Sequence, residues 1–150
     1  MLDTMHAFAT WKGGHEALLE DDRAHSVTVD LPVDEGGRSQ GPSALELSLL
    51  ALAGSIATVF ASVAERKRVP FHGVSVALEA ERPKGAPTIT RVRGTLRVRT
   101  HASFSEVEAA LRLTLHTSPV SVLFERAQIP IEVSPILLPT ISRAAPLMPH

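Results

Sequence analysis

The fold is decided by the stretch Gly41-Pro42-Ser43-Ala44-Leu45-Glu46-Leu47-Ser48-Leu49-Leu50-Ala51-Leu52-Ala53-Gly54-Ser55. Ser43 followed three residues later by Glu46 has the pattern of a capping box, in which each side chain accepts from the other residue's backbone N–H. The apolar run starts at once and continues to about Lys67, where cations and then Pro70 mark a helix end. We predict one long helix that is apolar nearly all round, and such a helix needs cover on most sides.

A membrane-spanning helix is the alternative for this stretch. Residues 44–64 match the roughly 20 residues that a span requires. Charged, strand-like segments flank them, which favours a fully buried helix of a soluble domain. Residues 1–14 also lack the apolar run of a secretory signal, so we expect a cytoplasmic protein without a membrane partner. The polar residues inside the stretch are Glu46, Ser48, Ser55, Thr58 and Ser62.

Strand patterns lie on both sides of the helix. Residues 26–31 alternate polar and apolar, and a weaker strand signal at 17–20 would pair with them across Asp21-Asp22. After the helix, residues 74–81 alternate in the same way, and a Pro- and Gly-containing turn leads into a strand at 89–99. Alternate arginines of this last strand predict a solvated sheet face. The formal net charge of -1 and the acidic neighbouring strand argue against nucleic acid as a partner.

The C-terminal part combines two short helices, one strand and a tail. Ser103 or Ser105, each followed three residues later by glutamate, caps a helix that ends near Thr117. Ser118-Pro119 then has the pattern of an N-cap followed by proline, opening a helix through about Arg126. Residues 129–133 predict an edge strand. We therefore expect one domain, 1–133, and a Pro-rich apolar arm, 134–150, that lies on this subunit or a partner.

The absence of cysteine is the most decisive feature of the composition. It excludes disulfides, thiolate metal sites and cysteine nucleophiles. The seven histidines are scattered without metal-ligand spacing, so neither a metal nor a cofactor is expected.

The signature from Gly41 to Ser55 resembles that of the OsmC/Ohr family of organic hydroperoxide reductases, in which the run ends in cysteine. A second landmark, Ser118-Pro119-Val120-Ser121, is similar to the family's Cys-Pro-Val-Ser or Cys-Ser-Val-Ser. The resemblance covers about residues 11–133. It implies an α+β OsmC-like fold with antiparallel sheets wrapped around a long buried central helix, in an intertwined homodimer.

The resemblance also implies two redox thiols at the subunit interface, where this chain has Ser55 and Ser118. A serine hydroxyl cannot form a thiolate, a sulfenic acid or a disulfide, so thiol peroxidase activity is not expected. A hydrolase nucleophile is disfavoured as well, because the sequence around Ser55 lacks the Gly-x-Ser-x-Gly pattern. Glu46 is a possible site residue, although it lies on the helix face opposite Ser55 and the capping box already explains it. Arg38 and Arg23 are the candidates for the family's site arginine.

Our leading hypothesis is a cytoplasmic homodimer that has lost peroxidase activity and binds a small apolar or acyl-like molecule at its interface. Gly54, Ser55, Phe60 and Ser118 are the predicted ligand-binding residues. Two alternatives stay open. One is a hydroperoxide reductase or other oxidative-stress role given by the family, and the other is a structural or interaction protein that uses its C-terminal arm.

Overall fold

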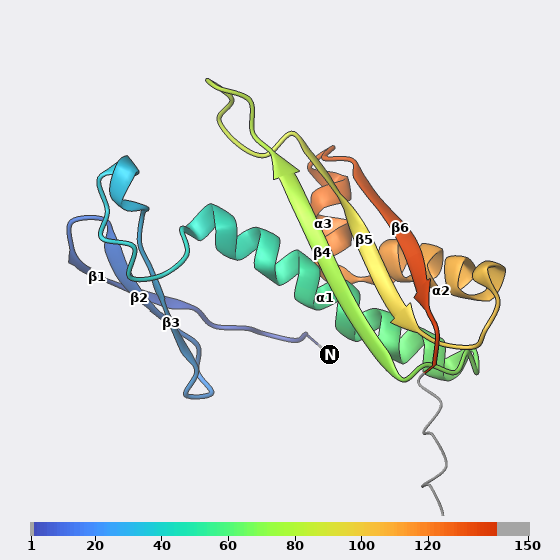
Figure 1. The fold of residues 1–150 in the computed structure, drawn as a ribbon. Coiled ribbons are helices and arrows are strands. Elements are labelled where there is room, and N and C mark those ends of the chain that lie inside the picture. The colour runs from blue at the N-terminus through green and yellow to red at the C-terminus, as the bar shows by residue number, and fades with distance from the viewer. Residues whose placement is uncertain (1, 141–150) are drawn as a thin grey trace, which may run out of the picture. The chain divides into compact units, whose positions relative to one another are not determined.

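The computed structural model describes residues 2–140, which form two compact units, one up to Leu50 and one from Ala51 onward (Figure 1). Each unit contains a three-stranded sheet, and the long helix α1, Ala44–Arg66, begins in the first unit and continues in the second. The predicted α+β class is confirmed. Most of the predicted C-terminal arm, residues 141–150, lies outside the described residues.

The first unit is an antiparallel sheet of β1, Phe8–Gly13, β2, Glu16–Glu20, and β3, Ser26–Val29. The hairpin predicted across Asp21-Asp22 is present between β2 and β3. Strand β1 was not predicted. It turns into β2 through Gly13 and Gly14, which adopt φ values of +108° and +55° that side chains with a Cβ disfavour.

Asp30 organises the loop that joins β3 to α1. Its buried carboxylate accepts backbone N–H bonds from Leu31 at 2.8 Å, Arg38 at 3.1 Å and Gln40 at 3.2 Å. Burial raises the pKa of Asp30, but these three donors outweigh it and hold the pKa below its ordinary value. The loop, which includes the 3₁₀ turn η1, Val33–Glu35, is thereby folded back to the start of α1.

Gly41 occupies a position that only glycine fits. A Cβ at this residue would lie 2.0 Å from the backbone oxygen of Thr28. The next residue, Pro42, accepts a hydrogen bond from the backbone N–H of Asp30 at 3.0 Å. The Gly-Pro start of the signature therefore allows close approach of the chain to β3 before the helix begins.

The capping box of α1 is confirmed. The Ser43 N–H donates to a Glu46 carboxylate oxygen at 3.1 Å, and the Glu46 N–H donates to the Ser43 hydroxyl at 3.1 Å. Among residues 2–140, α1 is the one helix long and apolar enough to cross a membrane, with a mean hydropathy of 2.0. The core helix of a soluble protein passes the same test of length and composition.

The second unit contains a mixed sheet in the order β4-β5-β6. Strands β4, Gly73–Glu81, and β5, Arg91–Arg99, are antiparallel, whereas β6, Ile131–Leu138, runs parallel to β5. The expectation of purely antiparallel sheets is therefore wrong for this pair. A parallel neighbour requires a crossover connection, and α2 and α3 supply it.

Helices α2, Phe104–Thr117, and α3, Pro119–Arg126, lie on the same face of this sheet as α1 (Figure 1). The fully buried side chains of β5 face them, as its alternation predicted, and a stripe of α1 at helical spacing completes the core. Ser103, rather than Ser105, is the N-cap of α2 and forms a complete capping box with Glu106. The fully buried core residues of α1 and β5 are Leu52, Ile56, Phe60, Val63, Ala64, Val92, Leu96 and Val98.

Strand β6 continues five residues beyond the predicted domain boundary at Val133 and ends at Leu138. Pro135 lies inside it without breaking the sheet. The carbonyl of Pro130, just before β6, accepts from Val92, and that of Leu138 accepts from Thr100, just after β5. Even-numbered residues along β6 therefore direct their backbone groups toward β5. The nitrogen of Pro135 therefore faces the open edge, where no N–H is needed.

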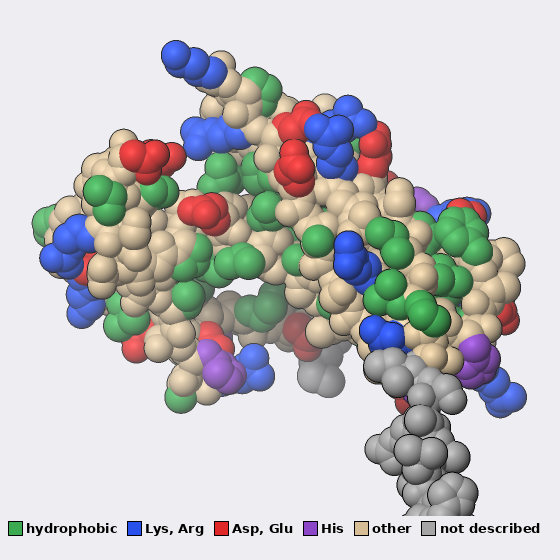
Figure 2. All heavy atoms as spheres, in the orientation of Figure 1, with side chains coloured by type: hydrophobic (Ala, Val, Ile, Leu, Met, Phe, Trp, Pro, Cys, Tyr) green, Lys and Arg blue, Asp and Glu red, His purple; other side chains and the backbone are tan. Residues whose placement is uncertain are grey.

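Acidic and basic side chains mix at the end of this sheet where β4 ends and β5 begins (Figure 2). Arg91 donates to Glu132 at 2.7 Å, and Arg93 pairs with Glu81. The arginine row of β5 is therefore partly neutralised by its neighbours and does not form an uninterrupted basic stripe.

Candidate functional site

The serines at the two landmark positions, 63 residues apart in sequence, lie side by side in the second unit. Their hydroxyl oxygens are 2.6 Å apart, and either hydroxyl can be the donor. Ser55 is half-buried on α1, whereas Ser118 is fully buried at the start of α3. The sequence motifs had singled out both residues, and the fold joins them into one polar pair.

Local structure explains the position of Ser118. It is the N-cap of α3, and its hydroxyl accepts from the Ser121 N–H at 3.5 Å. Pro119 at the first helical position has no N–H to satisfy and fixes the backbone for the turn. Ser118 is both the C-cap of α2 and the N-cap of α3, so the ends of two helices fix the position of its hydroxyl.

The chemistry available to this pair is narrow. Within residues 2–140, the only side chain that hydrogen-bonds to either hydroxyl is the other serine. A serine nucleophile needs a base within hydrogen-bond reach and a third group to orient that base. The pair can therefore donate and accept hydrogen bonds, but its geometry does not provide nucleophilic activation.

The other predicted ligand-binding residues differ in their accessibility. Gly54 is exposed, and a Cβ added there would meet nothing within 4 Å. Phe60 is fully buried and packs edge-on against Phe71, with ring centroids 6.3 Å apart. In the single chain, Phe60 therefore presents no surface to a ligand.

The predicted charged site residues have partners within the first unit. The Glu46 carboxylate accepts from Ser43 at the start of α1. Arg38 donates to Glu16 at 3.3 Å, and Arg23 lies 4.0 Å from Asp21. Among the described residues, no group of three histidine, aspartate or glutamate side chains is placed to hold a metal ion.

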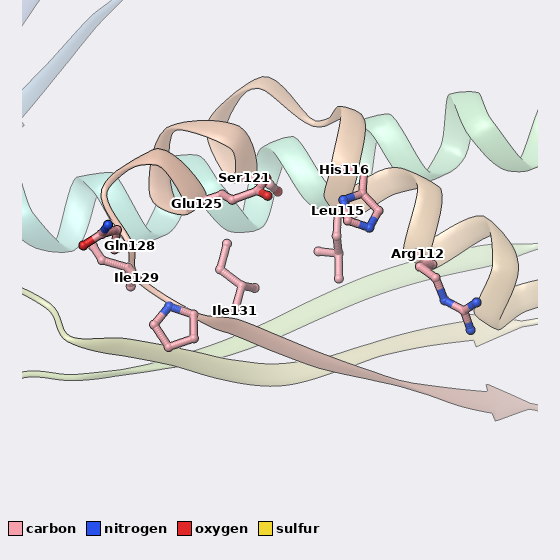
Figure 3. A pocket seen from close by; sticks show the side chains of 9 residues that line it. Arg112, Leu115, His116, Ser121, Glu125, Gln128, Ile129 and Ile131 are labelled. Atoms are coloured by element: carbon pink, nitrogen blue, oxygen red, sulfur yellow. The ribbon is translucent and has the colours of Figure 1, made fainter.

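A second polar position, Ser121, was not predicted as a site residue. Its side chain is 1% exposed, and among the described residues its hydroxyl has no hydrogen-bond partner. It lines a cavity of about 500 Å³ between α2, α3 and the start of β6 (Figure 3). The sequence contained only partial signals for this cavity: Ser121 ends the second landmark, and Arg112 and His116 are four residues apart on α2. The cavity residues are Arg112, Leu115, His116, Ser121, Glu125, Gln128, Ile129, Pro130 and Ile131.

The fold is that of a small α+β protein with a long central helix. The residue that ends the first motif, on this helix, contacts the residue that begins the second motif. The model of the family described as OsmC-like protein matches residues 36–134. The chain belongs to the OsmC-like family. Comparison with curated proteins gives no match.

Solved structures of the same fold come from several bacteria. An OsmC-like protein from Mycoplasma pneumoniae is 15% identical, with a TM-score of 0.80 over 92% of this chain and 99% of the other. An organic hydroperoxide resistance protein OsmC from Legionella pneumophila is 20% identical, with a TM-score of 0.68 over 90% and 98%. A putative organic hydroperoxide resistance protein from Vibrio cholerae, with captopril bound in one of its active sites, is 15% identical, with a TM-score of 0.69 over 90% and 92%. These likenesses establish the fold.

Proposed function

We propose that this chain is a cytoplasmic, homodimeric OsmC-like protein without thiol peroxidase activity, which binds a small apolar or acyl-like molecule beside its serine pair. The observation that carries the proposal is the 2.6 Å contact between the hydroxyls of Ser55 and Ser118. The two residues at the positions where the family has its thiols are in contact, but the sulfur atoms that the redox cycle requires are missing. What remains is a polar pair that can orient a ligand.

The loss of peroxidase activity follows from the chemistry of oxygen and sulfur. Hydroperoxide reduction in the family passes through a sulfenic acid and a disulfide, and a hydroxyl forms neither. Both positions are changed, so attack and resolution are lost together. A variant with one remaining thiol could still react once, but this chain has none.

The homodimer is supported by the apolar surface of α1 that a single chain leaves exposed. Its most apolar 18-residue window has a mean hydropathy of 2.0, yet only 28% of that window is buried. Individual large apolar side chains are exposed as well, including Leu50 on α1 itself at 57% and Trp11 on β1 at 73%. Exposed apolar surface of this kind marks an interaction face. A second copy of the chain would supply the missing cover and close the space beside Gly54 and Ser55.

Ligand binding at that interface is supported by the exposed, side-chain-free position at Gly54, the residue that precedes Ser55 on α1. The Vibrio cholerae relative holds captopril in one of its active sites, so a protein of this fold can accommodate a small organic molecule there. A mostly apolar pocket with a few placed polar groups is the usual composition of such sites.

Native mass spectrometry of freshly purified protein tests the proposal. We expect the mass of a dimer that carries a reproducible small molecule. Ser55→Leu should remove that molecule while the dimer mass remains, because the added side chain fills the space beside the hydroxyl pair. Ser134→Leu, at an exposed position on β6, is the matched control and should retain it. An empty wild-type dimer would contradict the binding role, and a monomer would contradict the assembly.

A second assay addresses the chemistry. Purified protein mixed with an organic hydroperoxide and a dithiol should consume peroxide at the rate of the buffer alone. Consumption above that rate, proportional to protein concentration, would favour a hydroperoxide reductase role and overturn this part of the proposal.

A further inference from the structure

The cavity between α2, α3 and β6 contains a feature that the serine pair does not explain. Ser121 is 1% exposed, and its hydroxyl has no hydrogen-bond partner among residues 2–140. A buried polar group without a partner costs free energy, so native proteins rarely keep one without a reason. Ser121 is one of the residues that line the cavity, so a molecule bound there could supply the partner that its buried hydroxyl lacks.

The size and lining of the cavity suit a small organic molecule. Its volume of about 500 Å³ lies within the roughly 300–1,000 Å³ range of small-molecule sites. Leu115 on α2 and Ile131 on β6 point into the space between helices and strands, and Ile129 and Pro130 extend this apolar wall (Figure 3). An apolar body of a ligand would therefore be covered on two sides.

The charge around Ser121 favours an anionic head. Ser121 lies in the first turn of α3, where the helix dipole places partial positive charge. Arg112 and His116 line the same cavity from α2. Arg112 donates to Glu108 at 2.9 Å through one nitrogen, which leaves its other N–H groups available. Glu125 is the acidic lining residue, one turn further along α3 and next to Gln128, at the end away from α2 (Figure 3).

We propose that this cavity binds a small carboxylic acid with an apolar tail. The carboxylate accepts from the Ser121 hydroxyl on the side of Arg112 and His116, and the tail lies along Ile129 and Ile131. The cavity is formed within one chain. It adjoins the serine pair, because the Ser121 N–H donates to the Ser118 hydroxyl, but neither Ser55 nor Ser118 lines it. It therefore does not depend on the function proposed above.

Binding of octanoate to the full-length protein, followed by calorimetry and by NMR of isotope-labelled side-chain methyl groups, tests this site. We expect octanoate to bind and to shift the methyl signals of Leu115 and Ile131. Octanol, which has the same tail without charge, should bind at least several-fold more weakly. Binding at the serine pair would instead shift Ala51 and Val59, which lie four residues before and after Ser55 on the same face of α1, and that result would overturn the assignment.

Two variants identify the groups that hold the head. Ser121→Ala should weaken octanoate binding roughly tenfold, because a hydrogen bond to a charged group is lost. Arg112→Gln should weaken it several-fold and reduce the preference over octanol. Ser134→Ala, an exposed serine on β6, is the control and should bind as the wild type does. No binding at the solubility limit of octanoate, or equal affinity for wild type and Ser121→Ala, would overturn the proposal.

Discussion

Ser55 and Ser118 differ by one atom each from the cysteines that the OsmC-like signature has at these positions. Their hydroxyl oxygens lie 2.6 Å apart, and both residues fall within the 36–134 range that matches the OsmC-like family. The hydroxyl of Ser118 also caps α3, so this residue has a structural role that is independent of any reaction. The helix cap is therefore sufficient to explain a polar residue at position 118. It does not explain why the Ser118 hydroxyl also contacts the hydroxyl of Ser55.

Ser121 provides a prediction about stability. Replacing it by alanine removes a buried hydroxyl that has no partner in residues 2–140, so we expect the free energy of unfolding to rise by about 1 kcal/mol. Urea denaturation of the ligand-free protein measures the change. Ser134→Ala, on the surface, should stay within about 0.5 kcal/mol of wild type. Destabilisation of Ser121→Ala would mean that the hydroxyl has a partner in solution.

At the scale of elements, the N-caps determine the residue at which each helix begins. Ser103 accepts from the Glu106 N–H, and Glu106 accepts from the Ser103 N–H at 2.9 Å. The hydrogen bonds from Ser103 lower the pKa of Glu106. The sequence left two serines as candidates for this cap, because Ser105 also precedes a glutamate by three residues. Only the structure distinguishes them, since the start of α2 is fixed by the turn after β5.

We predict that Ser103→Ala lowers the free energy of unfolding by about 1 kcal/mol, the usual effect of losing an N-cap. Ser105→Ala should change it by less than about 0.5 kcal/mol, because Ser105 lies in the first turn of α2 and is exposed. Thermal or urea unfolding of the two variants makes the comparison. The reverse order would place the start of α2 two residues later.

The β2–β3 turn carries a pH-dependent contact. Asp21 accepts from the His25 N–H and its ring nitrogen, at 2.9 and 2.7 Å, and from the Arg23 N–H at 2.9 Å. The backbone and side-chain hydrogen bonds from His25, followed by the one from Arg23, lower the pKa of Asp21 from 3.8 to about 2. A carboxylate with a lowered pKa stabilises the fold fully above its ordinary pKa and loses this contribution as pH falls through the lowered value.

We therefore expect the β2–β3 turn to keep its hydrogen bonds at pH 3.8 and to lose them as the pH approaches 2. The amide proton of His25, followed by NMR during an acid titration, should move with a midpoint near 2. Asp21→Asn should remove that transition. A midpoint close to 3.8 in the wild type would show that the three hydrogen bonds do not form in solution.

Elements with local signals were predictable, and those that depend on distant partners were not. The capping box fixed the start of α1 at Ser43, and alternation identified the buried side of β5. Strand β6 was cut short at Val133 because Pro135 breaks a strand unless its nitrogen faces an open edge, and that edge is set by pairing with β5. The parallel direction of β6 could not be read from its residues for the same reason.

The candidate sites followed the same division. The landmark motifs identified Ser55 and Ser118, but their hydrogen bond closes a separation of 63 residues and needed the fold. The cavity around Ser121 was missed because α2, α3 and β6 each contribute part of its wall. Residues of a pocket share no single periodicity in sequence, so no one pattern indicates them.

At the scale of the whole molecule, α1 links the proposed function to the proposed assembly. Its buried stripe is covered within the second unit, while Gly54 and Thr58 lie on an accessible face one turn apart. Glycine inside a helix costs about 1 kcal/mol relative to alanine, so a monomer would gain stability from a larger residue at Gly54. A dimer in which the partner packs closely on this face would be harmed by the same change. Whether a larger residue at Gly54 stabilises or destabilises the protein therefore shows whether this face of α1 is packed against a partner.

Gly54→Leu is the variant that separates these cases. We expect it to weaken the dimer by at least about tenfold, since overpacking a close contact costs roughly 1–3 kcal/mol. Light scattering after size-exclusion chromatography over a range of concentrations measures the shift toward monomer. Ala109→Leu, which adds the same side chain at an exposed position of α2, is the matched control and should leave the dimer unchanged. A Gly54→Leu protein that dimerises as the wild type does, or that only gains thermal stability, would show that this face of α1 is not the interface and that the serine pair is not closed by a second copy.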